Sequence, residues 1–236
     1  MRRVATATIM TAMAMFHNLD GIPRGELRIA STVAVGKSQL IITLPEFIAD
    51  NPEVKVSLDL TEREIDIRRE DFDVAICFAE QHKTPDIVVR RIMQSRRALC
   101  AAPAYLSHAG VPTSFAELAK HNCLRVRGAS KRNVWSNADP FSGDTIEAKG
   151  SFEGNSTDVV FRAALAGIGI ARLPCYMANE KFQTSELVHV MPEYAPPSTD
   201  IVVMFADKRN LAPKTRAFVD FLVKLFRNVR NLEMTG

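Results

Sequence analysis

The chain has 236 residues, of which 47% are hydrophobic and 24% are charged. This composition is typical of a globular protein with apolar material for one large domain or two small ones. The four cysteines show no metal-ligand or disulfide spacing, which predicts buried free thiols in a reducing compartment, the cytoplasm. The net charge of +3 is small and the basic residues are scattered, so nucleic-acid binding by this chain is not predicted.

The N-terminal segment permits two interpretations. Arg2 and Arg3 precede a mildly apolar stretch, residues 4–16, as in a secretory signal. Threonines dilute that stretch, however, and this favours a tail or linker helix over residues 1–23. No stretch of the chain is long and apolar enough to span a bilayer, so no membrane partner is expected.

The first half of the chain alternates between β-rich runs and helical patterns. Predicted strands cover residues 27–31, 54–60, 73–78 and 87–92, and predicted helices cover residues 37–50 and 62–69. Such alternation predicts a parallel sheet covered by helices on both faces. Pro45 lies inside the first helical pattern, where a kink or a new helix start is expected.

The second half repeats this alternation and ends in a helix. Short helices are expected at residues 103–107 and 114–120, and strands at 99–102, 123–126, 145–152, 168–173, 187–190 and 201–205. The clearest helix has an N-cap at Asn155 or Ser156 and stops at Gly167. The last helix begins near Pro213 and has one apolar stripe.

An ordered series of motifs resembles the effector-binding region of LysR-type transcriptional regulators. These motifs are GELRIA at 25–30, LPEF at 44–47, NPEV at 51–54, DFDVAI at 71–76, AAPAYL at 101–106, LAKHNCL at 118–124, AGIGI at 166–170, LP at 173–174 and RAFVDFL at 216–222. Each motif is weak alone, but their order and spacing are specific. The resemblance extends over about residues 25–230 and implies a regulatory domain that senses a small-molecule effector.

The resemblance implies an α/β fold of the type 2 periplasmic-binding-protein kind, with two Rossmann-like lobes joined by two crossover strands. Residues 24–98 and 204–232 are expected to form lobe I, and residues 99–203 to form lobe II. The crossovers are expected near residues 99–102 and 201–205. A homodimer or higher homo-oligomer is implied, paired through the helix at 38–50 and the helix at 214–230 of opposite subunits.

Members of this family contact DNA through an N-terminal helix-turn-helix, and residues 1–20 are too short for that unit. DNA binding is therefore expected only through a helix-turn-helix that this chain lacks. A free solute-binding protein of the same fold is the alternative, and it would need the N-terminal segment as an export signal.

Ligand-site candidates lie where strands end and helices begin, because free backbone N–H groups there favour anions. In lobe I they are Ser31, Thr32, Gly36, Lys37, Ser38, Thr61 and Phe78; in lobe II they are Arg127, Asn155, Ser156, Thr157 and Arg172. For Asn155 and Ser156 plain helix capping is an equal alternative, for Phe78 a core position, and for Arg127 a surface position. The charge of Arg172, within an apolar strand, needs a partner or the cleft. A small anion, in particular a carboxylate, is the expected effector.

Catalysis, a cofactor and a metal are not predicted. The glycines Gly167 and Gly169 follow a helix and precede a strand, the reverse of a dinucleotide-binding loop. The five histidines have no metal-ligand spacing, and no G-x-S-x-G motif is present. His121 and Cys123 share one short predicted strand, which is a poor arrangement for a base and a nucleophile.

Overall fold

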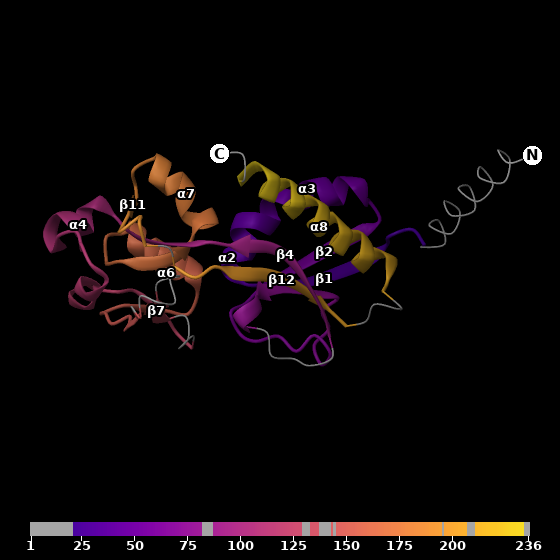
Figure 1. The fold of residues 1–236 in the computed structure, drawn as a ribbon. Coiled ribbons are helices and arrows are strands. Elements are labelled where there is room, and N and C mark those ends of the chain that lie inside the picture. Colours follow the sequence, from indigo (N-terminus) through magenta and orange to yellow (C-terminus); the bar gives the residue numbers. More distant parts are fainter. Residues whose placement is uncertain are drawn as a thin grey trace, which may run out of the picture.

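Two separate sheets, each with its own helices, organise the chain (Figure 1). The computed structural model describes residues 21–81, 87–128, 133–136, 143, 145–194, 196–206 and 211–233, with side chains in the last helix up to Phe226. The predicted tail therefore lies outside the described residues, except for residues 21–23. The predicted α/β fold with two lobes is confirmed.

The first sheet has five strands in the order β2-β1-β3-β12-β4. Strand β1 is parallel to β2 and β3, whereas β12 is antiparallel to both β3 and β4, so the sheet is mixed and not wholly parallel as predicted. The strands are β1 Gly25–Ser31, β2 Val54–Leu60, β3 Val74–Phe78, β4 Val88–Ser95 and β12 Thr199–Phe205.

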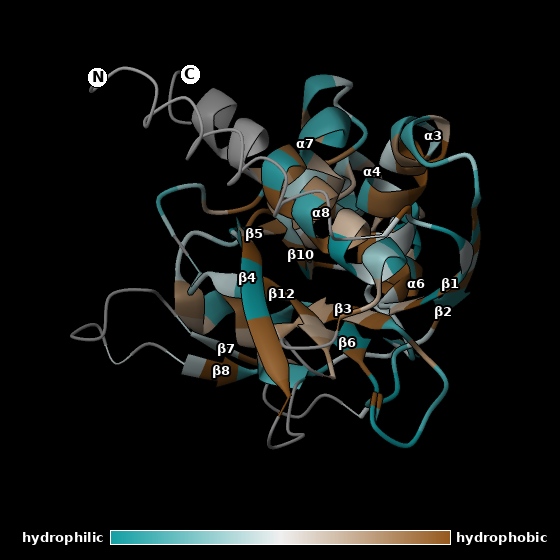
Figure 2. Cartoon of the chain, turned by 90° about the vertical axis from the view of Figure 1, so that its right-hand side faces the viewer, coloured by the Kyte–Doolittle hydropathy of each residue, from teal (hydrophilic) through white to brown (hydrophobic). Residues whose placement is uncertain are grey.

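Two helices cover one face of this sheet, α3 (Ile41–Asp50) and α8 (Pro213–Glu233) (Figure 1). Phe47 of α3 meets Phe218 of α8 edge to face, with ring centroids 5.1 Å apart. Both helices carry polar and apolar residues (Figure 2), and the buried side chains of each join one core with the strands. Each such large side chain contributes roughly 1.5–3 kcal/mol of burial free energy.

An irregular segment, residues 61–73, packs on the other face, so the predicted helix at 62–69 is wrong. Ile65 and Ile67 are both buried, and this spacing of two brings them onto one side of an extended chain rather than of a helix. Arg63 bonds both carboxylate oxygens of Glu70, which closes the segment into a compact loop. Packing of the two isoleucines against the sheet therefore overrides the helical composition.

The first helical region runs from Val33 to Asp50 without interruption, as predicted for residues 37–50. It comprises α2 (Val33–Val35), the π-helical turn η1 (Gly36–Leu40) and α3. The helix continues through Pro45, and the departure from α geometry lies one turn earlier, in η1. Single π turns within α-helices are frequent at functional sites.

The second lobe is built on the antiparallel sheet β10-β5-β11. Small strand pairs β6-β9 and β7-β8 stand beside it. The strands are β5 Arg97–Ala101, β6 Arg125–Val126, β7 Val134–Ser136, β8 Thr145–Glu147, β9 Glu153–Gly154, β10 Ala171–Pro174 and β11 Val188–His189. The helical elements are η2 Ala79–Gln81 in the first lobe and α4 Pro103–Ala109, η3 Phe115–Lys120, α6 Thr157–Leu165 and α7 Cys175–Gln183 in the second. Helix α7 was not predicted from the sequence.

Helix α6 begins and ends at the predicted signals. Ser156 is its N-cap, and the Ser156 Oγ accepts a hydrogen bond of 3.2 Å from the backbone N–H of Val159. The helix is followed by Gly167 at φ 75°, a left-handed conformation that glycine adopts without a steric cost. The capping alternative for Ser156 is thus confirmed, and Asn155 is exposed.

Two strand segments connect the lobes and run side by side in Figure 1. One passes from β4 into β5 at Arg96, and the other enters β12 at Thr199, which pairs with Ser95. Strand β12 pairs along its whole length within the first sheet, so its pairing favours lobe boundaries near residues 96 and 198 over those expected near 98 and 203. We propose lobe boundaries at these two positions.

Candidate functional site

Two arginines on neighbouring strands face one pocket. Arg97 begins β5 and Arg172 lies in β10, and the antiparallel register pairs Arg172 with Leu99 and Pro174 with Arg97. Since alternate residues of a strand share a face, Arg97 and Arg172 project from the same face as diagonal neighbours. Two guanidinium groups therefore border this side of the pocket, although Glu80 already pairs with that of Arg97.

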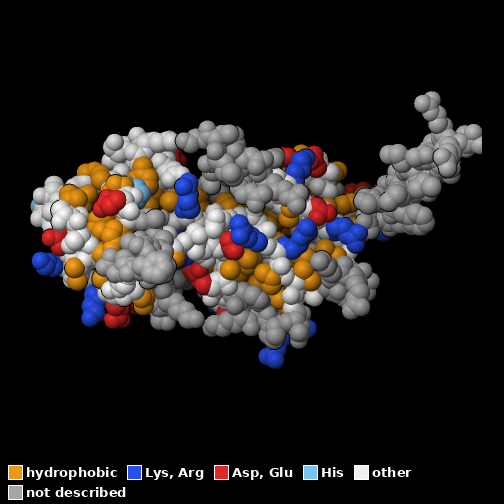
Figure 3. All heavy atoms as spheres, viewed as in Figure 1, with side chains coloured by type: hydrophobic (Ala, Val, Ile, Leu, Met, Phe, Trp, Pro, Cys, Tyr) orange, Lys and Arg blue, Asp and Glu red, His pale blue; other side chains and the backbone are white. Residues whose placement is uncertain are grey.

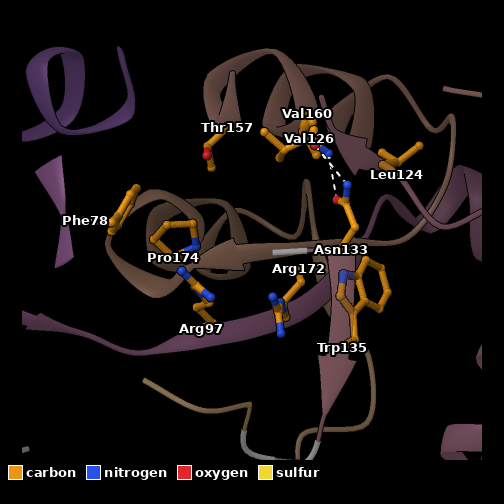
Figure 4. Close-up of a pocket in the computed structure, with 10 residues that line it drawn as sticks. All are labelled: Phe78, Arg97, Leu124, Val126, Asn133, Trp135, Thr157, Val160, Arg172 and Pro174. Atoms are coloured by element: carbon orange, nitrogen blue, oxygen red, sulfur yellow. Dashed lines mark hydrogen bonds between the residues drawn. The ribbon is translucent and has the colours of Figure 1, made fainter. Parts of the chain in front are cut away.

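The walls of this pocket are mainly apolar and aromatic (Figure 4). The space left free inside these walls is about 20 Å³, room for little more than one water molecule, so an effector would have to move the walls apart. The lining residues are Phe78, Arg97, Leu124, Val126, Asn133, Trp135, Thr157, Val160, Arg172 and Pro174. Phe78 comes from the first lobe and the others from the second lobe or its first strand, so the pocket lies between the lobes. We call it the arginine pocket.

Three of the sequence-predicted candidates meet there, namely Phe78, Thr157 and Arg172. Phe78 is 1% exposed and belongs to the core of the first lobe, so the core alternative is confirmed, and the residue also lines this pocket. The Arg172 Nη1 donates to the backbone oxygen of Val134 at 3.3 Å. This bond ties the guanidinium to the β7–β8 hairpin.

Arg97, Trp135 and Asn133 were missed by the sequence reasoning. Arg97 was counted among the scattered basic residues, although its side chain is only 11% exposed. Asn133 bonds the backbone of Val126 twice, accepting at 3.0 Å and donating at 2.9 Å (Figure 4). The only signal in the sequence that could have identified Arg97 was strand alternation, because neighbouring residues of a strand, such as Arg96 and Arg97, point to opposite faces.

The N-terminus of α6 already has a negative charge. Asp158 lies in its first turn, and the Lys37 Nζ reaches Asp158 Oδ2 from the first lobe at 2.8 Å. An acid at this end offsets the helix dipole. The predicted anion site on the free N–H groups of α6 is therefore less favourable than the arginines nearby.

The candidates at the turn after β1 do not line the arginine pocket. Thr32 and Thr61 line a separate, smaller cavity that also includes Arg63, Cys77 and Gln81. The Thr32 Oγ1 is buried and has no hydrogen-bond partner among the described residues. This unsatisfied hydroxyl is the feature of the turn that best fits a ligand contact.

The remaining candidates are engaged in local structure or exposed. The Ser31 hydroxyl donates to the backbone oxygen of Thr32 at 3.2 Å, and the Ser38 hydroxyl donates to that of Ala34. Gly36 is buried, and a Cβ there would meet Leu60 at 2.1 Å. Arg127 is exposed outside the arginine pocket.

The three buried cysteine thiols, those of Cys77, Cys100 and Cys123, are poor nucleophiles. Burial raises the pKa of Cys77 and of Cys123 to about 12, and it raises that of Cys100 as well. His121 Nδ1 lies 3.1 Å from the Tyr105 hydroxyl. Among the described residues, no group of histidine, cysteine and acidic side chains is arranged to hold a metal ion.

Basic and acidic side chains are interspersed on the face drawn in Figure 3. Arg90 pairs with Asp220 at 3.6 Å and Arg91 with Asp200 at 3.3 Å, so acidic side chains balance these two neighbouring arginines. Within residues 21–233, apart from the gaps named above, no helix is long and apolar enough to cross a membrane.

Comparisons with known proteins agree with this architecture. The model of the LysR substrate binding domain family matches residues 20–227. The HTH-type transcriptional activator TtdR of Escherichia coli strain K12 is 28% identical over 202 residues, which are 85% of this chain and 64% of that protein. The HTH-type transcriptional regulator CrgA of Neisseria meningitidis is 28% identical over 225 residues, 94% of this chain and 73% of that protein. The chain thus spans about two thirds of the length of such curated relatives.

The solved structures that match include isolated regulatory domains. The CrgA regulatory domain from Neisseria meningitidis superimposes with a TM-score of 0.78 at 25% identity, over 86% of this chain and all of that one. The effector domain of AmpR from Pseudomonas aeruginosa has a TM-score of 0.73 at 17% identity, over 89% of this chain and all of that one, and shares the fold. These relatives are regulators, and none of them favours the alternative of a free solute-binding protein. The chain therefore belongs to the LysR substrate-binding domain family, the effector-binding domains of LysR-type transcriptional regulators.

Proposed function

We propose that this domain binds a small anionic effector, specifically a carboxylate, in the arginine pocket. The observation that carries the proposal is the placement of Arg97 and Arg172 on one face of β5 and β10. A guanidinium binds a carboxylate with two parallel hydrogen bonds, and such charge-assisted bonds are roughly twice as strong as neutral ones. The aromatic and aliphatic walls then select an anion with an apolar, flat body.

The proposed site retains Phe78, Thr157 and Arg172 from the sequence-based candidates, and Phe78 is its contact from the first lobe. Thr157 is 5% exposed and reaches the pocket from the start of α6 (Figure 4). A ligand that touches both lobes would stabilise one lobe angle over others.

The domain is proposed to be a non-catalytic sensor. A LysR-type regulator acts on DNA, so the proposed location is the cytoplasm. The proposed assembly is a homodimer or higher homo-oligomer. DNA contact is assigned to the helix-turn-helix of full-length regulators and not to this domain. Ligand binding would change the angle between the lobes around the two connecting strands.

The test uses anions with matched neutral analogues. Benzoate and benzamide, and succinate and succinamide, are titrated into the protein at low salt while its thermal unfolding is followed. A ligand that binds only the folded state raises the melting temperature in a concentration-dependent way. We expect stabilisation by an acid and not by its amide.

Two arginine variants locate the site. Arg172→Met removes the charge in the arginine pocket, and Arg127→Met makes the same change at an exposed position. The first variant should weaken binding of the anion at least 10-fold, about 1.4 kcal/mol, and the second should leave it unchanged. Equal binding by Arg172→Met and the wild type, or preference for the amides, would contradict the proposal.

A further inference from the structure

The Glu80 side chain contacts both of the strands that connect the lobes. Glu80 lies in η2, directly after β3. Its Oε1 accepts from Arg97 Nη2 at the start of β5, and its Oε2 accepts from Thr199 Oγ1 at the start of β12. The carboxylate therefore links the first lobe to the two connecting strands at once.

This contact is largely shielded from water. The side chains of Arg97 and Glu80 are 11% and 28% exposed. An ion pair in such surroundings is screened less by salt than a surface pair, and removing one partner leaves the other charge uncompensated. The Arg97–Glu80 pair is thus a strong local interaction.

Arg97 is shared between this ion pair and the arginine pocket. Its guanidinium lies 5.8 Å from the centroid of the Phe78 ring and lines the pocket beside Pro174 (Figure 4). A bidentate bond to an anion needs one edge of the guanidinium, and Glu80 already holds the Nη2 of that group. Glu80 and an anion in the pocket therefore compete for hydrogen bonds from the guanidinium of Arg97.

We propose that Glu80 sets the affinity of the arginine pocket for anions by acting as a built-in competitor for Arg97. While the pocket is empty, the Glu80 carboxylate neutralises Arg97. An anion that binds between Arg97 and Arg172 draws the guanidinium of Arg97 away from Glu80. The Glu80 carboxylate is then held less firmly, and its hydrogen bond with Thr199 at the start of β12 weakens. Occupancy of the pocket is in this way transmitted to both connecting strands. The inference rests on the proposed function, because it requires that anions bind in this pocket.

The experiment compares two acid-to-amide variants by titration calorimetry with benzoate at low salt. Glu80→Gln keeps the shape and an acceptor oxygen but removes the negative charge that pairs with Arg97. Glu153→Gln makes the same change in net charge at an acid that pairs with Arg125 at 3.9 Å, away from Arg97. We expect Glu80→Gln to bind benzoate about 10-fold more tightly than the wild type, and Glu153→Gln to bind within about 2-fold of it.

Further variants separate competition from a purely structural role. In the Arg97→Met background, Glu80→Gln should no longer change the affinity for benzoate, because the guanidinium with which Glu80 pairs is absent. Glu80→Asp, which keeps the charge but shortens the side chain, should tighten binding less than Glu80→Gln, and it serves if the amide variant does not fold.

The outcomes distinguish this inference from the proposed function. If folded Glu80→Gln binds benzoate no more tightly than the wild type, while Arg172→Met still loses binding, only the role of Glu80 is overturned. A failure of both the wild type and Glu80→Gln to bind benzoate or succinate overturns the inference together with the proposed function. Tighter binding that survives Arg97→Met also counts against competition.

Discussion

Lys37 and Asp158 form an ion pair across the two lobes, with Lys37 Nζ 2.8 Å from Asp158 Oδ2. Lys37 lies in the π-helical turn of the first lobe and Asp158 in the first turn of α6 in the second. Their side chains are 45% and 14% exposed, so solvent screens the pair on one side. Such a pair contributes only about 0–1 kcal/mol, yet it is placed to influence the lobe angle.

Removing this pair should change the lobe angle more than the stability. Asp158→Asn eliminates the charge at nearly constant shape, and we expect a larger radius of gyration by small-angle scattering. The free energy of unfolding should change by less than about 1 kcal/mol. The double variant Lys37→Asp/Asp158→Lys should restore the wild-type radius only in part, because a lysine is unfavourable at a helix N-terminus. An unchanged scattering profile for Asp158→Asn would contradict the prediction.

The double hydrogen bond between Asn133 and Val126 should be important for both stability and binding. Asn133→Ala leaves the backbone N–H and C=O of Val126 without these partners, at a cost of about 1–3 kcal/mol. Since both residues line the arginine pocket, anion affinity should fall as well. Urea unfolding measures the first effect and calorimetry the second. Asn155→Ala, at an exposed position, is the control, and equal losses in the two variants would refute this role.

His189 should make the domain sensitive to mild acid. Its ring stacks on Phe182 with centroids 5.3 Å apart, and burial lowers the pKa of His189, while Glu193 opposes this less strongly. The unfolded chain takes up a proton near the ordinary value of 6.5, whereas the folded state resists it. Its stabilising contribution is therefore complete above about pH 6.5 and is lost as the pH falls through the lower folded value.

The measurement is the melting temperature at successive pH values between about 7 and 5. His189→Gln should flatten the decline over this range, and His108→Gln, at an exposed position of α4, should leave it unchanged. The same decline in His189→Gln and the wild type would assign the acid sensitivity to other groups.

Exposed isoleucines of α3 are the positions at which to test self-association. Ile41 and Ile42 are 54% and 68% exposed, while Leu40 and Phe226 are 0% and 2% exposed and belong to the core. In a twofold-symmetric pair one patch is used twice, so Ile42→Asp should yield monomers that remain folded. Leu40→Asp should instead unfold the first lobe. Analytical ultracentrifugation checks the assembly, and a monomeric wild type at high micromolar concentration would count against the dimer.

The local elements were largely readable from the sequence. Strand β2 was predicted with its observed bounds, Val54–Leu60, because a run of β-branched and leucine residues with alternating polarity is typical of a strand at the edge of a sheet. The start of α6 at Ser156 and its end before Gly167 followed from capping chemistry, which depends on neighbours in the chain. The family was identified from motifs in order along the chain.

The sequence by itself thus determined most of the elements, their order and the family, since these depend on contacts within a few residues or on a shared pattern. Only the tertiary structure decided the site. Arg97 and Arg172 are far apart in the chain, and the register of β5 and β10 alone sets them on one face. The loop at 61–73 and the position of Trp135 were decided in the same way, by packing against distant residues. Such contacts depend on sheet register and packing, which no local pattern in the sequence specifies.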